Sequence, residues 1–384
     1  MRIGLICGSF LPVVGGMEWK VHYLALAYRA MGHAVVVLCG LDRFRRGEAP
    51  QVDQPYPVVR FGVHMRGADA LGINSALGYL ALRQAHRTAA LDVVQAHCIT
   101  YPGNSAVAFQ ERYGVPAVLT PTGGDVQSVP GVAYGMRLQR GWDRTLRSNV
   151  RKAAAVTAIN FDMVETLAQM GARNRPVYVP NGVLWEQFQG GPTDVLVRRC
   201  GLAPEAFIFL AVGRNVPVKG YPLLLEAFAA LSRRRPRAVL AIVGRNVPGL
   251  RPDVQRLGLD GRVHLLDQMP MADLPAVFRS AHAFVSTSLM EGFPQVVAQA
   301  MAAGLPCILS DNPGHRAVAS VGGAVVVENG GPAGIADEME RLMEDDDRRR
   351  SLSAAGREGS RAYDWGVVAR RYVELFERVR GSSC

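Results

Sequence analysis

The sequence predicts an α/β protein built from two doubly wound domains, each a parallel sheet with helices on both faces. Short β-branched runs alternate with amphipathic helical patterns along nearly the whole chain. This alternation pauses near Pro180-Asn181-Gly182 and then begins again. The length of 384 residues also exceeds what one hydrophobic core usually serves. We therefore expect a first domain over residues 1–185 and a second over 186–364.

The first domain opens with a buried strand, a Gly-rich turn and a helix over about Glu18–Met31, which ends at Gly32. Its expected strands are Arg2–Cys7, Ala34–Cys39, Val58–Phe61, Asp92–Ala96, Pro116–Leu119, Ala155–Ile159 and Val177–Val179.

The second domain repeats the pattern, with helices over Leu223–Leu231 and from about Pro294. Its expected strands are Phe207–Val212, Ala238–Val243, Val263–Leu265, Ala283–Val285, Pro306–Leu309 and Ala324–Val327. A last helix, over 365–384, carries an apolar stripe with helical spacing that either domain could bury: Trp365, Val368, Tyr372, Leu375, Phe376 and Val379.

Composition excludes several classes of protein. An apolar fraction of 49% with 20% charged residues is that of an ordinary globular protein. No apolar run is long enough to span a membrane, and the N-terminus lacks the pattern of a signal peptide, so we expect a cytoplasmic protein. The six cysteines are scattered without a C-x-x-C pair, which argues against a disulfide framework or a structural metal.

The net charge of +10 is concentrated in the first domain. Residues 1–185 hold 19 Lys/Arg and 11 Asp/Glu, whereas residues 186–384 hold 24 and 22. This asymmetry indicates an acidic partner for the first domain. No nucleic-acid motif accompanies it.

The strongest local pattern runs from Val212 to Gly220, between a buried strand and a helix. Gly213 allows a tight exit from the strand. Arg214 and Lys219 then stand near a helix N-terminus, where anions are favoured, and together they suit a diphosphate. Two cations at this spacing are also found in solvated loops, but the flanking Val-Gly and Lys-Gly favour a ligand site.

A second cluster lies over 288–301, after another strand. Glu291 precedes Gly292 and Pro294, which lead into a helix whose first-turn amides have no intrahelical partner. A carboxylate beside such amides can hold sugar hydroxyls. A surface glutamate at a turn is the alternative.

The first domain contributes weaker candidates at the ends of its strands. Gly15-Gly16 follows the first strand and would let backbone approach a ligand, although it forms no G-x-G-x-x-G fingerprint. His97 ends the strand over 92–96 and is expected to project into a cleft, unless it is an ordinary core histidine. The turn that follows the next strand places Asp125 beside it.

These motifs together resemble the retaining glycosyltransferases of family 4, which have the GT-B fold of two Rossmann-like domains facing a central cleft. The resemblance runs essentially from end to end. The family includes many bacterial mannosyl- and glucosyltransferases of surface polysaccharides and glycolipids. It implies that Gly15 and Gly16 approach the donor phosphates, and that the last helix crosses back to the first domain. Donor contacts are implied for Gly213, Arg214, Lys219, Glu291, Phe293, Pro294, Gln295 and Val296, for His97 at the sugar, and for Asp125.

One position departs from the family pattern. The family's second glutamate, which grips the nucleotide ribose, falls here on Gln299. An amide still donates and accepts hydrogen bonds but loses the charge-assisted ones. The resemblance thus leaves the donor's nucleotide (UDP, GDP or ADP), its sugar and the acceptor open.

The expected function is transfer of a hexose from a nucleotide-diphosphate sugar to a glycan or lipid-linked acceptor, without a metal or other cofactor. A GT-B epimerase or phosphorylase and a two-lobed sugar-binding protein are the alternatives. Glu344–Asp347 is interpreted as solvated surface rather than a metal site.

A run of arginines in the first domain has helical spacing. Arg137, Arg140, Arg144, Arg147 and Arg151 would share one helical face, opposite an apolar row that includes Leu138 and Trp142. A solvated face is one interpretation, and peripheral contact with an anionic membrane or a polyprenyl-diphosphate acceptor is the other.

Overall fold

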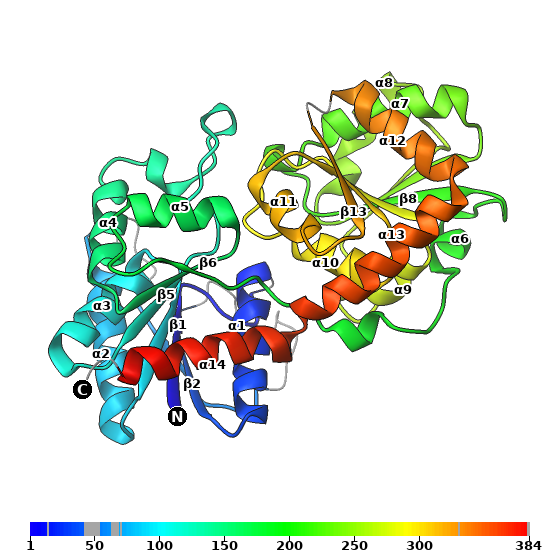
Figure 1. The fold of residues 1–384 in the computed structure, drawn as a ribbon. Helices are drawn as coiled ribbons and strands as arrows, with labels where there is room; N and C mark the ends of the chain where they lie inside the picture. Colours follow the sequence, from blue (N-terminus) through cyan, green and yellow to red (C-terminus); the bar gives the residue numbers. More distant parts are fainter. Residues whose placement is uncertain (14, 42–53, 63–68, 70, 329–330, 382–384) are drawn as a thin grey trace. The chain divides into compact units, whose positions relative to one another are not determined.

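The computed structural model describes residues 1–13, 15–41, 54–62, 69, 71–328 and 331–381. The chain divides into two compact units (Figure 1). Unit 1 comprises Met1–Asn181 together with Trp365–Cys384, and unit 2 comprises Gly182–Asp364.

Unit 1 is built on a parallel sheet with the strand order β3-β2-β1-β4-β5-β6-β7. Chain order reverses at β1, which pairs with β2 on one side and β4 on the other. The strands are β1 (Arg2–Cys7), β2 (Ala34–Gly40), β3 (Val58–Phe61), β4 (Val93–His97), β5 (Ala117–Thr120), β6 (Ala155–Ala158) and β7 (Val177–Tyr178). The helices are α1 (Gly16–Ala30), α2 (Ile73–Thr88), α3 (Tyr101–Tyr113), α4 (Trp142–Lys152), α5 (Phe161–Gln169) and α14 (Trp365–Gly381), with short 3-10 turns η1 (Pro130–Val132) and η2 (Met136–Leu138).

The terminal helix α14 lies alongside α1 (Figure 1). Trp365 stacks in a tilted arrangement on Tyr23, and Phe376 meets Tyr28 edge to face. Trp365, Val368, Tyr372, Leu375 and Phe376 are buried, so unit 1 covers the apolar stripe.

Unit 2 has a parallel sheet with the order β10-β9-β8-β11-β12-β13, and its chain order reverses at β8. The strands are β8 (Phe207–Val212), β9 (Ala238–Val243), β10 (Val263–Leu266), β11 (Ala283–Ser286), β12 (Cys307–Ser310) and β13 (Ala324–Val327). The helices are α6 (Val195–Cys200), α7 (Tyr221–Arg234), α8 (Arg251–Arg256), α9 (Leu274–Arg279), α10 (Gln295–Ala302), α11 (Pro313–Ala319), α12 (Pro332–Glu344) and α13 (Asp346–Gly359). Short turns are η3 (Trp185–Phe188), η4 (Pro217–Lys219), η5 (Val247–Leu250) and η6 (Ser360–Tyr363).

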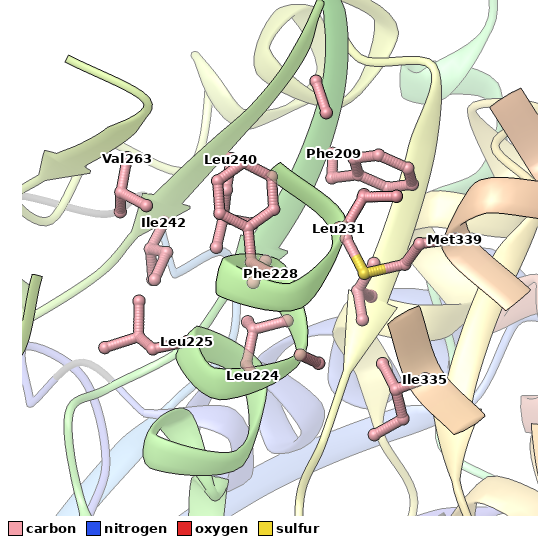
Figure 2. Packing of buried hydrophobic residues seen from close by; sticks show 14 of the residues in the cluster. Phe209, Leu224, Leu225, Phe228, Leu231, Leu240, Ile242, Val263, Ile335 and Met339 are labelled. Atoms are coloured by element: carbon pink, nitrogen blue, oxygen red, sulfur yellow. The ribbon is translucent and has the colours of Figure 1, made fainter. Parts of the chain in front are cut away.

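The core of unit 2 lies between this sheet and the helix pair α7 and α12 (Figure 2). Leu224 and Phe228 of α7, both fully buried, face Leu240 of β9, and Met339 of α12 packs beside them. Fully burying such a side chain contributes about 1.5–3 kcal/mol. This packing holds β8 in place and so determines where the loop at its carboxyl end begins.

The expected fold class is confirmed, and each expected strand is present to within a residue or two. The prediction that the five arginines share one helical face is wrong. Gly141, with φ of 87°, caps α4 in a left-handed conformation, so Arg137 lies in η2 and Arg140 in the turn before the helix. Only Arg144, Arg147 and Arg151 are on α4.

Candidate active site

In each unit the predicted site residues gather where strand order reverses. Open α/β sheets bind ligands beyond the carboxyl ends of their strands at this point, because loops diverge there to the two faces. In unit 1 the point lies between β1 and β4, and in unit 2 between β8 and β11.

The loop after β8 carries the two cations. Arg214 is exposed, whereas Lys219 is half-buried at the end of η4. Gly220 then starts α7 with φ of 63°, and a Cβ there would lie 2.2 Å from the carbonyl oxygen of Thr287. The Leu289 amide also donates to the Val218 carbonyl over 2.8 Å. The loops that follow β8 and β11 are thereby tied together.

This tie brings Lys219 onto Glu291. Nζ of Lys219 donates to Oε1 of Glu291 over 2.6 Å, and their side chains are 20% and 14% exposed. Burial acts to raise the pKa of Glu291, but the charge and hydrogen bond of Lys219, together with His315 and a hydrogen bond from Ser288, leave the pKa lowered. A small pocket beside the pair is lined by Lys219, Tyr221 and the segment 285–288. The diphosphate cation and the sugar-binding carboxylate expected from the sequence thus form one ion pair.

The sequence prediction missed the loop after β12, which supports Glu291. A Cβ on Gly314 would lie 2.5 Å from the Glu291 carbonyl oxygen, so only glycine fits there without displacement. His315, which is fully buried, shares hydrogen bonds with the Ser310 carbonyl (2.6 Å, Nδ1) and with the Ser286 hydroxyl (3.1 Å, Nε2). Burial lowers the pKa of His315 to about 4, against the charge of Glu291. An Asn-Pro N-cap signal directly after a strand was the available clue.

The helix expected to start near Pro294 begins at Gln295, with Pro294 as its N-cap. Phe293 is buried and packs edge to face on Tyr363. The Gln295 side chain donates to the Gly182 carbonyl over 3.2 Å. The backbone of Gln295 and Val296 forms the first turn of α10. Gln299 is half-buried one turn further along α10.

In unit 1 the glycine pair begins α1, with Gly15 as N-cap and Gly16 as first residue. His97 ends β4 as expected, but its imidazole is fully buried instead of projecting into open space. The Asp125 carboxylate accepts from the backbone N–H groups of Thr122 (2.9 Å), Gly123 (3.0 Å) and Ile99 (3.1 Å). It therefore joins the turn after β5 to the turn that follows His97.

Other acidic and cavity features lie apart from these residues. Asp346 and Asp347 pair with Arg349 and Arg350 within α13. Within the described ranges, no group of three or more His, Cys, Asp or Glu side chains could hold a metal ion. A cavity of about 680 Å³ in unit 1 lies at the amino ends of β5 and β6 and contains none of the predicted site residues.

Comparison with solved structures identifies the fold. Sucrose-phosphate synthase from Thermosynechococcus elongatus matches with a TM-score of 0.82 at 19% identity, over 99% of each chain. Anabaena HepE, solved with UDP and glucose, matches with a TM-score of 0.78 at 21% identity, over 98% of this chain and 100% of that one. Two Rossmann-like units of this topology are the GT-B fold of glycosyltransferases.

The chain belongs to the group 1 glycosyl transferases. The model of that family matches residues 196–359, and the model of the glycosyl transferase 4-like domain matches residues 15–182. The phosphatidyl-myo-inositol mannosyltransferase of Mycobacterium leprae is 30% identical over 100% of this chain and 98% of its own length. The GDP-mannose:cellobiosyl-diphosphopolyprenol alpha-mannosyltransferase of Xanthomonas campestris is 29% identical over the same shares.

Proposed function

We propose that this glycosyltransferase moves a hexose, mannose or glucose, from a nucleotide-diphosphate sugar to a lipid-linked acceptor with retention of anomeric configuration. The observation that carries the proposal is the Lys219–Glu291 pair at the carboxyl edge of the unit 2 sheet, with Arg214 on the same loop as Lys219. A cation for phosphate and a carboxylate for hydroxyls, held side by side, match the two ends of a glycosyl phosphate.

Charge accounts for the contribution of unit 2 to the reaction. As the bond between the anomeric carbon and the phosphate oxygen breaks, its electron pair stays on the phosphate and positive charge grows on the sugar. Lys219 and Arg214 stabilise the leaving diphosphate, and because Lys219 is already fixed by Glu291, little reorganisation is needed. Glu291 accepts hydrogen bonds from sugar hydroxyls.

The configuration is retained because the acceptor attacks the anomeric carbon on the same face of the sugar from which the diphosphate departs. The acceptor hydroxyl oxygen bonds to the anomeric carbon, and its proton passes to the departing phosphate oxygen, so that no protein nucleophile and no metal takes part. In this proposal Glu291 pairs with Lys219 and binds hydroxyls instead of acting as a nucleophile, so the reaction differs from the two-carboxylate arrangement of retaining glycosidases.

The names of the relatives support a lipid-linked acceptor. The two mannosyltransferases act on a cellobiosyl-diphosphopolyprenol and on a phosphatidyl-myo-inositol. Both acceptors are anionic lipids, and residues 1–185 hold the excess of positive charge in this chain. Among the described residues no helix is long and apolar enough to cross a bilayer. We therefore propose peripheral action at the inner face of a membrane, in surface polysaccharide or glycolipid synthesis.

The deciding experiment incubates the protein with UDP-, GDP- and ADP-sugars and lipid extracts, with and without EDTA. Release of nucleotide diphosphate with a new α-linked glycolipid, identified by the one-bond C1–H1 coupling, supports the proposal. A β-linked product would contradict the proposed retention of configuration, and loss of turnover in EDTA would contradict the proposed metal-free mechanism. Sugar binding without nucleotide release would indicate a binding protein, and release of a free sugar isomer would indicate an epimerase.

A further inference from the structure

The loop that carries Glu291 contains a buried serine to which the proposed function gives no role. Ser288 follows β11 and is 1% exposed. Its hydroxyl donates a hydrogen bond to the carboxylate of Glu291. Since Nζ of Lys219 donates to Oε1 of the same carboxylate over 2.6 Å, the acidic side chain is held by two separate donors.

The backbone of Ser288 is held in turn by the loop after β12. Its carbonyl oxygen accepts from the Ser310 hydroxyl over 2.7 Å and from the side-chain amide of Asn312 over 2.8 Å. Two hydrogen bonds occupy both lone pairs of a carbonyl oxygen. Because Ser310 ends β12 and Asn312 caps α11, elements outside the loop that carries Ser288 determine its position.

The side chains of Asn312 and His315 are themselves fixed by hydrogen bonds. Oδ1 of Asn312 accepts from the His315 N–H over 3.0 Å, which leaves the amide nitrogen for Ser288. Nδ1 of His315 lies 2.6 Å from the Ser310 carbonyl oxygen, which can only accept, so we place the ring proton on Nδ1. Nε2 then accepts from the Ser286 hydroxyl over 3.1 Å, and Oγ of Ser286 lies 3.4 Å from Oγ of Ser288.

The same loop closes on the main chain of Glu291. A Cβ on Gly314 would lie 2.5 Å from the Glu291 carbonyl oxygen and 2.7 Å from its Cβ. The backbone of Glu291 thus packs on the start of α11 while two donors hold its carboxylate. A glutamate side chain that is free to rotate loses this freedom when a ligand binds, whereas a side chain already held does not.

We propose that Ser288 is a positioning residue of the transfer site, which holds the Glu291 carboxylate in the orientation that binds the donor sugar, and that Asn312 and His315 keep Ser288 in place. This inference rests on the proposed function, in which Glu291 accepts hydrogen bonds from sugar hydroxyls. Ser288 acts through Glu291 and contacts no substrate. Its loss should therefore weaken recognition of the sugar without weakening recognition of the nucleotide.

Calorimetric titrations with ligands that differ only by the sugar test this role. The pairs are UDP with UDP-glucose and GDP with GDP-mannose. Ser288→Ala should lower the affinity for the nucleotide sugar by roughly fivefold and leave the affinity for the nucleotide diphosphate unchanged. Ser288→Thr keeps the hydroxyl and should restore the affinity for the nucleotide sugar. Equal weakening of both ligands, or no weakening of either, would contradict the inference.

Unit 2 offers a matched control at the amino end of β11. Ser280 is 4% exposed, and its hydroxyl donates to the Ala276 carbonyl over 2.6 Å and accepts from the Val195 N–H over 3.0 Å. Ser280→Ala thus also deletes a buried, hydrogen-bonded hydroxyl, and it should leave both affinities unchanged.

A second variant removes only the hold on the Ser288 backbone. Asn312→Ser retains an oxygen that can cap α11 but loses the amide that reaches Ser288. It should weaken nucleotide-sugar binding in the same selective way as Ser288→Ala. Where Ser288→Ala does not fold, Asn312→Ser provides the same comparison, and equal weakening of both ligands in it would contradict the inference.

A double-mutant cycle measures the contact between Ser288 and Glu291 without any donor. Ser288→Ala and Glu291→Ala remove the two ends of one hydrogen bond, so the double variant should lose less stability to urea than the sum of the single losses. Ser280→Ala combined with Glu291→Ala should lose the sum. Additive losses in both cycles would overturn the inference.

These measurements distinguish failure of the inference from failure of the proposed function. If the native chain binds no nucleotide sugar and turns none over, the proposed function fails, while the double-mutant cycle still decides whether Ser288 holds Glu291. If turnover is normal and Ser288→Ala binds nucleotide sugars as the native chain does, only the inference fails.

Discussion

Nζ of Lys219 lies 2.6 Å from Oε1 of Glu291, across the ends of two neighbouring strands of the unit 2 sheet. The pair fixes the cation where the leaving group's charge develops, and it gives the carboxylate a counter-charge in a position only 14% exposed. Stability and turnover are therefore coupled at these two residues.

Lys219→Ala should lower turnover by roughly two to three decades, similar to the loss of one oxyanion donor. It also leaves Glu291 partly buried without its partner, which should reduce the free energy of unfolding by about 1–3 kcal/mol. Steady-state kinetics with the identified donor and urea unfolding measure the two effects.

The double variant Lys219→Met/Glu291→Gln separates them. It removes both charges and should recover most of the unfolding free energy without recovering turnover. Lys152→Ala, which removes a half-exposed lysine, is the matched control and should leave both quantities near normal. Near-normal turnover of a folded Lys219→Ala enzyme would remove Lys219 from the site.

His315 makes the stability of unit 2 depend on pH. Its pKa is lowered to about 4 in the folded protein, so the unfolded chain binds the proton more readily. The stabilisation is fully present above about pH 6.5 and is lost as the pH falls toward 4. His315→Gln should show a smaller decline over this window. Urea unfolding at several pH values tests this, and an unchanged slope in the variant would contradict it.

The sequence predicted the strands and the loops that carry the site because buried parallel strands are continuous apolar runs and ligands bind at their ends. The Lys219–Glu291 contact spans 72 residues of sequence and depends on two loops being tied at Gly220, which no local pattern reveals. Contact between Ser288 and the loop after β12 is likewise a tertiary property. The prediction of one arginine face is wrong because the left-handed backbone of Gly141 starts a new helix, so the helical spacing does not continue across this residue.

Gly314→Ala should disturb Glu291 without altering any charged group. The added Cβ meets the Glu291 carbonyl oxygen at 2.5 Å, so the loop must shift. We expect the KM for the donor to rise by about tenfold, equivalent to about 1.4 kcal/mol of lost binding. Gly334→Ala, on α12, meets only Val327 at 3.4 Å and is the control. Equal kinetics of the two variants would contradict the proposed role of the Gly314 loop.

Gln299→Glu introduces the carboxylate that the family pattern has at this position. A charge-assisted hydrogen bond to the ribose exceeds a neutral one by about 1 kcal/mol, so the donor KM should fall by roughly fivefold. Gln255→Glu on the exposed surface of α8 controls for the added charge. A donor KM that is unchanged or higher in Gln299→Glu would show that this helix position does not meet the nucleotide.

The arginines around α4 provide a test of membrane contact. Arg137 and Arg147 are both paired with Asp143, each over 2.7 Å. Arg140, Arg144 and Arg151 are exposed and form no ion pair with any of the described residues. Each cation near an anionic surface contributes about 1 kcal/mol of binding, so these three should dominate the attraction.

The protein should therefore sediment with vesicles of anionic phospholipid at low salt and remain in solution with neutral vesicles. The triple change Arg140→Glu, Arg144→Glu and Arg151→Glu should abolish sedimentation. The same change at three exposed arginines of unit 2, Arg199, Arg233 and Arg237, should not, which separates a located contact from an effect of net charge. If the unaltered chain fails to sediment at low salt, these arginines are a solvated face, because the electrostatic attraction is strongest under that condition.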